Sequence, residues 1–127
     1  MTTLEEFLAL PDISQETAVI NLKRIGDIVV KPMTHRQFSS YQARAKVKTA
    51  KGLDFDTGKL NLLVATGQIV QPDISNADFL AKAGCNTASE FLEKKLKAGE
   101  IAELAAKITE ISGFDVDLNE KIEEAKN

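Results

Sequence analysis

The sequence has 127 residues, of which 43% are hydrophobic and only 6% aromatic, and its formal net charge is −3. This length suits one domain with its own hydrophobic core, and the single cysteine, Cys85, excludes an intrachain disulfide framework and a cysteine-based metal cage. No apolar run approaches the roughly 20 residues that cross a membrane, and the N-terminus lacks a basic, apolar signal segment, so we expect a protein of the cytoplasm.

The first predicted element is a short N-terminal helix in the segment TTLEEFLAL. A Thr-x-x-Glu capping signal starts at Thr2 or at Thr3, and Pro11 should end the helix. Because an isolated helix of this length is marginal in water, we expect it to be loosely held. Its apolar residues follow at helical spacing: Leu4, Phe7 and Leu8.

A β-hairpin is predicted over about residues 17–32, where β-branched residues flank a Gly-Asp pair. A three-residue loop at 25–27 would place Val30 opposite Leu22, and Pro32 opposite Ile20. This register keeps one face of the hairpin apolar, so we favour it over a two-residue turn.

A longer helix is predicted at about residues 35–50. Thr34 and Gln37 form a capping box at its start, and Gly52 stands where the helix should end. The next segment, LDFDTG, is predicted to be a loop. After it, KLNLLVATGQIV is apolar nearly all round, which favours a central, buried helix.

Further helices are predicted toward the C-terminus, with N-terminal caps at Ser75 or Asn76 and at Thr87. The glycines expected to end these helices are Gly84, Gly99 and Gly113. The predicted fold class is therefore α+β. The chain should form a mostly helical single domain over residues 1–127, with one N-terminal β-hairpin packed against five to six short helices.

Several motifs resemble chemical sites, but their context does not support them. The DTG triplet at 56–58 copies that of aspartic proteases, yet helices rather than strands are predicted on both sides of it. Asp54 begins a segment like a calcium loop, but the twelfth position is Ala65 instead of Glu. His35, the only histidine, has no Ser, Cys or carboxylate at a recognised spacing. We predict no catalytic, cofactor-binding or metal-binding residue, and no enzyme.

The basic residues are unevenly distributed. Six Lys or Arg residues and no acidic residue lie between Asp27 and Asp54. This stretch is either the solvated face of a helix or a patch for an acidic partner. A nucleic-acid regulator would use Arg44, Lys48 and Lys51, which share a face of the predicted helix, but the negative net charge argues against such binding.

An apolar stripe in the last third of the chain is the candidate partner-binding site. Its members recur at helical spacing and continue past a glycine stop: Ile101, Leu104, Ile108, Ile111 and Phe114. Such a stripe is either the core face of a helix or a groove that takes a partner helix. The pattern alone leaves both interpretations open.

Taken together, several segments resemble the tail assembly chaperones of phages and prophages of Gram-positive bacteria. The resemblance covers nearly the whole chain, including VINLKRIGDIVVKPMTHRQFSSY and LNLLVATGQIVQPDI. Its most specific pieces are the VQPD turn at 70–73, the SGF break at 112–114 and the AKN ending at 125–127. None of these pieces is a catalytic signature.

The resemblance implies a non-catalytic chaperone in the host bacterial cytoplasm. Such a protein would keep the tape-measure protein soluble and help tail-tube subunits to assemble around it, binding neither nucleic acid nor membrane. Self-association is compatible with this role. The alternative is a structural tail or head-completion component of the phage particle.

The resemblance also bears on the C-terminal segment, where Asp117 and Glu120 predict the cap of a last helix over 115–127. Members of the family are often extended by a programmed frameshift. The codons for Ala-Lys-Asn can contain the slippery heptamer A-AAA-AAY. We therefore predict that this helix is either a mobile chain end or the joint to a longer, frameshifted product.

Overall fold

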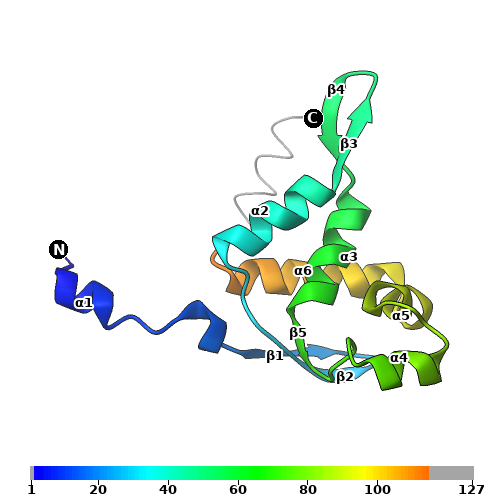
Figure 1. Ribbon diagram of the computed structural model, residues 1–127, viewed down its shortest axis with the longest axis horizontal. Helices are drawn as coiled ribbons and strands as arrows, with labels where there is room; N and C mark the ends of the chain where they lie inside the picture. The colour runs from blue at the N-terminus through cyan, green and yellow to red at the C-terminus, as the bar shows by residue number, and fades with distance from the viewer. Residues whose placement is uncertain (1, 115–127) are drawn as a thin grey trace.

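The computed structural model describes residues 2–114 (Figure 1). The predicted terminal helix at 115–127 lies outside the described residues. Within them the chain forms α-helices α1 (Leu4–Leu8), α2 (His35–Arg44), α3 (Thr57–Gln68), α4 (Ala77–Ala83), α5 (Ala88–Lys95) and α6 (Ala98–Ile111). The strands are β1 (Ala18–Leu22), β2 (Gly26–Val30), β3 (Lys46–Thr49), β4 (Gly52–Phe55) and β5 (Ile69–Gln71). The predicted class, α+β and mostly helical, is confirmed.

The N-terminal hairpin forms as predicted but in a different register. Ile20 pairs with Ile28, and Leu22 pairs with Gly26, so the three-residue loop lies at 23–25 instead of 25–27. The observed register differs from the predicted one by four residues, an even number. Every side chain therefore keeps its predicted face, and the apolar pattern could not separate the two registers. The turn decides between them, because Gly26 adopts a positive φ of 109° that favours glycine.

A three-stranded antiparallel sheet, ordered β1-β2-β5, supports the helices. Helix α6 packs on β1 and is crossed by α3, which in turn contacts α2 and α5 (Figure 1). The predicted central buried helix is confirmed as α3, which carries four buried residues. Its predicted end is wrong, because the helix stops at Gln68 and Ile69–Gln71 forms strand β5. The core between these elements includes Leu22, Val30, Leu63, Val64, Leu104 and Ile108.

One buried polar group links α3 to the sheet and to α2. Gln68 is fully buried, and its amide nitrogen donates to the carbonyl oxygens of Lys31 and Pro32 at 3.1 Å each. The Tyr41 hydroxyl donates to the Gln68 side-chain oxygen at 2.7 Å. These hydrogen bonds satisfy the buried amide and fix the backbone at the point where α3 ends and β5 begins. Burial raises the pKa of the Tyr41 hydroxyl, while the nearby Arg44 lowers it by a smaller amount.

The predicted helix at 35–50 is wrong beyond Arg44. Lys46–Thr49 instead pairs with Gly52–Phe55 in a second hairpin, so the segment predicted as a loop is partly a strand. The β-branched Val47 and Thr49 suit a strand, and Gly52 takes a positive φ of 115° at the turn. Gly52 therefore shapes a hairpin and is not the end of a helix.

A second correction concerns the glycines predicted to end helices. Gly84 and Gly113 do follow helix ends with positive φ, as expected. Gly99 does not: α5 ends at Lys95, and Gly99 lies in the first turn of α6. Asn76 and Thr87 act as N-caps, each accepting a hydrogen bond from a backbone N–H in its helix.

Two elements project from the body of the molecule (Figure 1). Helix α1 forms where the Thr3 cap predicts it, but Leu4 and Leu8 remain 84% and 85% exposed. The β3–β4 hairpin extends from a different side, and all eight of its strand residues are exposed. Both elements therefore show apolar side chains to solvent.

Candidate partner-binding site

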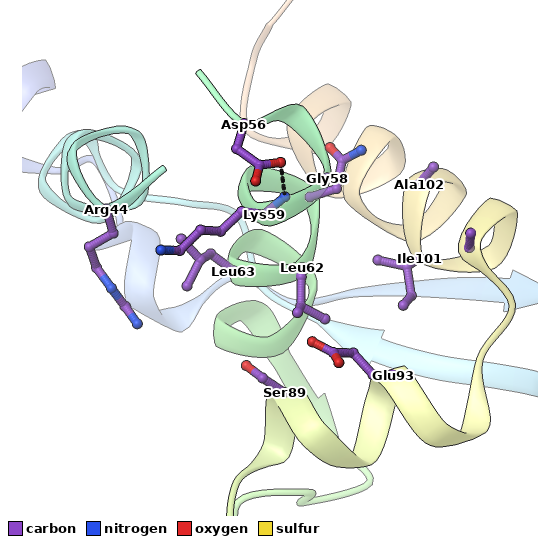
Figure 2. Close-up of a pocket in the computed structure, with 12 residues that line it drawn as sticks. Arg44, Asp56, Gly58, Lys59, Leu62, Leu63, Ser89, Glu93, Ile101 and Ala102 are labelled. Atoms are coloured by element: carbon purple, nitrogen blue, oxygen red, sulfur yellow. Dashed lines mark hydrogen bonds between the residues drawn. The ribbon is translucent and has the colours of Figure 1, made fainter. Parts of the chain in front are cut away.

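A groove of about 630 Å³ opens between α3, α5 and α6, with Arg44 added from the end of α2 (Figure 2). Its size falls within the range of about 300–1,000 Å³ that binding pockets occupy. The lining residues, from the four elements and the turn before α3, are Arg44, Asp56, Gly58, Lys59, Asn61, Leu62, Leu63, Ser89, Glu93, Ala98, Ile101 and Ala102.

The apolar part of the groove comes from helices whose other faces make the core. Leu63 is buried, while Leu62 and Ile101 are partly exposed and pack against the core cluster. Figure 2 shows Leu62 on α3 beside Ile101 on α6, with Ala102 one residue further along α6. This arrangement leaves side-chain surface that an apolar group of another polypeptide could cover.

Charged side chains border this apolar surface. Arg44 and Lys59 lie together near the N-terminal half of α3, whereas Glu93 lies across the groove on α5 (Figure 2). Asp56 is the N-cap of α3, because its carboxylate accepts a hydrogen bond of 3.0 Å from the Lys59 backbone N–H. The DTG triplet thus begins a helix, and this carboxylate has a structural task.

The predicted stripe is divided by the fold. Leu104 and Ile108 are 0% exposed and belong to the core. Ile101 lines the groove, while Ile111 and Phe114 are each 37% exposed at the other end of α6. The structure therefore does not bring the five residues together on one accessible surface, and the accessible members lie in two separate places.

The second of these places contains an aromatic pair. The rings of Phe114 and Phe38 lie with centroids 4.7 Å apart and tilted by 45°, which is a favourable aromatic geometry. Ser112 accepts a hydrogen bond of 2.8 Å from the Met33 backbone N–H, which ties the end of α6 to the segment before α2. These contacts position the SGF break beside α2.

The start of α6, just before Ile101, is held by an ion pair. The Arg24 guanidinium donates to both carboxylate oxygens of Glu100, at 2.9 and 2.6 Å, and also to the Lys95 carbonyl at 2.8 Å. The hydrogen bond from Arg24 and that from the Lys97 backbone lower the pKa of Glu100 to about 2. The loop of the β1–β2 hairpin, which carries Arg24, thereby fixes the junction between α5 and α6. It also fixes the position of Ile101.

The groove contains residues that the sequence did not single out. Lys59, Leu62 and Glu93 come from two helices whose neighbourhood is set by tertiary packing. One feature of the sequence does point to Leu62. It is an apolar residue outside the main stripe of a helix that is apolar nearly all round, so it can reach a second surface.

The other candidate residues form no reactive cluster. His35 is exposed at the first position of α2, and Cys85 is a buried, free thiol. Within residues 2–114, no group of three or more His, Cys, Asp or Glu side chains could hold a metal ion. In the same part of the chain, no helix is both long and apolar enough to cross a membrane.

Comparisons with known proteins agree with this architecture. The solved crystal structure of the protein YqbN matches with a TM-score of 0.67 and 18% sequence identity, covering 91% of this chain and 99% of that one. At that identity the match shows a shared fold. The search of curated proteins finds no match. A family model described as phage XkdN-like tail assembly chaperone protein matches residues 4–126, and the chain therefore belongs to this family of phage tail assembly chaperones.

Proposed function

We propose that this chain is a non-catalytic chaperone that binds the tape-measure protein through the groove between α3, α5 and α6. The observation that supports the proposal most is the groove itself, in which apolar side chains lie inside a rim of both charges. The proposed place of action is the cytoplasm of the host bacterium. The proposed partners are the tape-measure protein and the tail-tube subunits that later enclose it.

The proposed client segment is an amphipathic helix. Such a helix binds by placing a few apolar anchors, spaced three or four residues apart, into an apolar groove. Leu62 and Ile101 would contact the anchors, and Leu63 would close the floor. Long helical proteins present such stripes before assembly, and covering them would prevent the stripes from associating with each other.

The rim charges would orient the bound helix. Arg44 and Lys59 would attract acidic residues of the client at one side, and Glu93 would attract basic residues at the other. Complementary charges of this kind contribute mainly to specificity and to the rate of association. Tail-tube subunits would then release the client by competing for the same apolar stripe, which is a mass-action effect.

Ile111 and Phe114 form a second proposed contact at the far end of α6. Leu104 and Ile108 would support both contacts from the core and would not touch the client. The five residues predicted from the stripe thus take two roles in the proposal.

Substitutions in the groove test the proposal. Leu62→Ala and Ile101→Ala should each weaken binding of a purified tape-measure fragment by about tenfold, because each removes an apolar anchor. Isothermal titration calorimetry would measure this change. The matched control is Val19→Ala, which truncates an exposed apolar side chain outside the groove lining. Unchanged affinity in folded Leu62→Ala and Ile101→Ala variants would contradict the groove as the client site.

Mass spectrometry of purified phage particles separates this role from a structural one. A chaperone acts before the tail is complete, so it should be absent from particles that contain the tape-measure protein. Stoichiometric amounts of this chain in finished particles would favour a tail or head-completion component.

We further propose that residues 115–127 are the joint to a longer, frameshifted product. The support is the Ala-Lys-Asn ending, whose codons can form the heptamer A-AAA-AAY. The gene sequence tests this directly, since a GCG alanine codon or an AAG lysine codon would remove the heptamer.

A further inference from the structure

The two projecting elements, α1 and the β3–β4 hairpin, are complementary in charge and in apolar surface. The N-terminal arm, residues 2–17, contains four acidic residues and no Lys or Arg. The segment 44–55, which contains the hairpin, has four basic residues and one acidic residue. We infer that the arm of one copy of this chain docks on the β3–β4 hairpin of a second copy.

The arm presents one apolar face with acidic neighbours. Leu4, Phe7 and Leu8 share a side of α1 by their i, i+3, i+4 spacing, and they are 84%, 65% and 85% exposed. Glu5 and Glu6 lie in the same short helix. A helix of five residues has little stability by itself, so its apolar face needs a surface to pack on.

The hairpin presents a face that matches this helix. Its register pairs Lys46 with Phe55 and Lys48 with Leu53, so these four side chains lie on one face of the two strands. Leu53 is 75% exposed and Phe55 is 45% exposed. An isolated two-stranded hairpin is marginally stable, and a helix packed on its face would stabilise it. Leu53 and Phe55 would cover the apolar side of α1, while the net positive charge of the hairpin would attract the acidic arm as a whole.

The geometry favours a contact between copies. Helix α1 points away from its own body, and the hairpin extends from another side (Figure 1). Every residue of α1 is exposed. A contact of arm on hairpin joins two different surfaces, so it either closes as a reciprocal dimer or continues as a chain of copies.

Charge reversal tests the inference in the full chain by sedimentation velocity. The wild type should associate across the micromolar range, and added salt should weaken this association because exposed charges are screened. Glu5→Lys/Glu6→Lys and Lys46→Glu/Lys48→Glu should each weaken it by at least about tenfold. The control, Glu103→Lys/Glu110→Lys, makes the same change in net charge as Glu5→Lys/Glu6→Lys but on α6, and it should associate as the wild type does.

Mixing the two variants is the decisive part of the experiment. The Lys46→Glu/Lys48→Glu chain keeps an intact arm, and the Glu5→Lys/Glu6→Lys chain keeps an intact hairpin. Each should associate at least about tenfold more weakly than the wild type when alone, and mixing should restore association, because the intact arm meets the intact hairpin and the two reversed surfaces are again opposite in charge. A monomeric wild type, variants that associate as tightly as the wild type, or a mixture that associates no better than the variants alone would each overturn the inference. The last two results would indicate another interface or docking of the arm on its own hairpin.

Discussion

At the residue scale, Gln68 shows how one buried polar side chain can position several elements. Replacing it with leucine would leave the carbonyl groups of Lys31 and Pro32, and the Tyr41 hydroxyl, without their partner. We expect Gln68→Leu to reduce the free energy of unfolding by about 2 kcal/mol or more. Tyr41→Phe, the milder control, should cost only about 1 kcal/mol. Urea unfolding would measure both, and a neutral Gln68→Leu change would contradict this role.

Glu100 gives a prediction about pH. Its pKa is lowered from 4.5 to about 2 in the folded chain, so ionised Glu100 stabilises the fold. This contribution is complete above pH 4.5 and is lost as the pH falls toward about 2. The difference in melting temperature between wild type and Glu100→Gln should therefore be largest near neutral pH and shrink across that window. A difference that does not change with pH would contradict the ion pair with Arg24.

The close approach of α3 to α2 gives a third prediction. A Cβ atom at Gly67 would overlap the Tyr41 hydroxyl and lie 2.8 Å from its ring carbon Cζ. Gly67→Ala should therefore destabilise the chain by about 1–3 kcal/mol, although alanine usually favours a helix. In a double-mutant cycle, Gly67→Ala should cost less in a Tyr41→Leu background than in the wild type, which would locate the clash. A stabilising Gly67→Ala change would disprove it.

At the element scale, α6 separates core residues from accessible ones. Leu104→Ala should cost about 2–5 kcal/mol, because it opens a cavity at a fully buried position. Ile111→Ala, on the same helix but 37% exposed, should cost much less. Thermal unfolding of the two variants measures the contrast. Equal losses would contradict the division of the stripe.

The same element shows what could be predicted from sequence and what could not. Helical spacing identified the stripe on α6, but spacing cannot say which members another part of the chain will cover. Leu104 and Ile108 became core because α6 packs on both α3 and β1. The groove beside Ile101 depends on α3 and α5 meeting α6, and that is a tertiary arrangement with no local signal.

Local signals worked where a short-range hydrogen bond decides the backbone. The caps at Thr3, Thr34 and Asn76 formed as predicted. Local signals failed where two local structures compete for the same residues. Residues 46–49 have helical spacing with the preceding residues, yet their β-branched side chains and a turn at Gly52 favour a hairpin.

At the scale of the whole molecule, the fold has a packed body from which two elements project. The body combines the sheet, α3 and α6 with the groove on one side, and the arm and the β3–β4 hairpin extend from it (Figure 1). The proposed client binding and the proposed self-association would therefore use different surfaces. Groove variants should then leave the sedimentation behaviour unchanged, and hairpin variants should leave the affinity for the tape-measure fragment unchanged.

We propose that the groove between α3, α5 and α6 binds another polypeptide. Methyl NMR of the labelled chain, titrated with a tape-measure fragment, tests this most directly. We predict that the largest shifts fall on Leu62, Leu63 and Ile101, while Val19 and Leu80, which lie outside the groove lining, remain unchanged. Binding that shifts only the hairpin methyls of Val47 and Leu53, with Ile101 unaffected, would contradict the account.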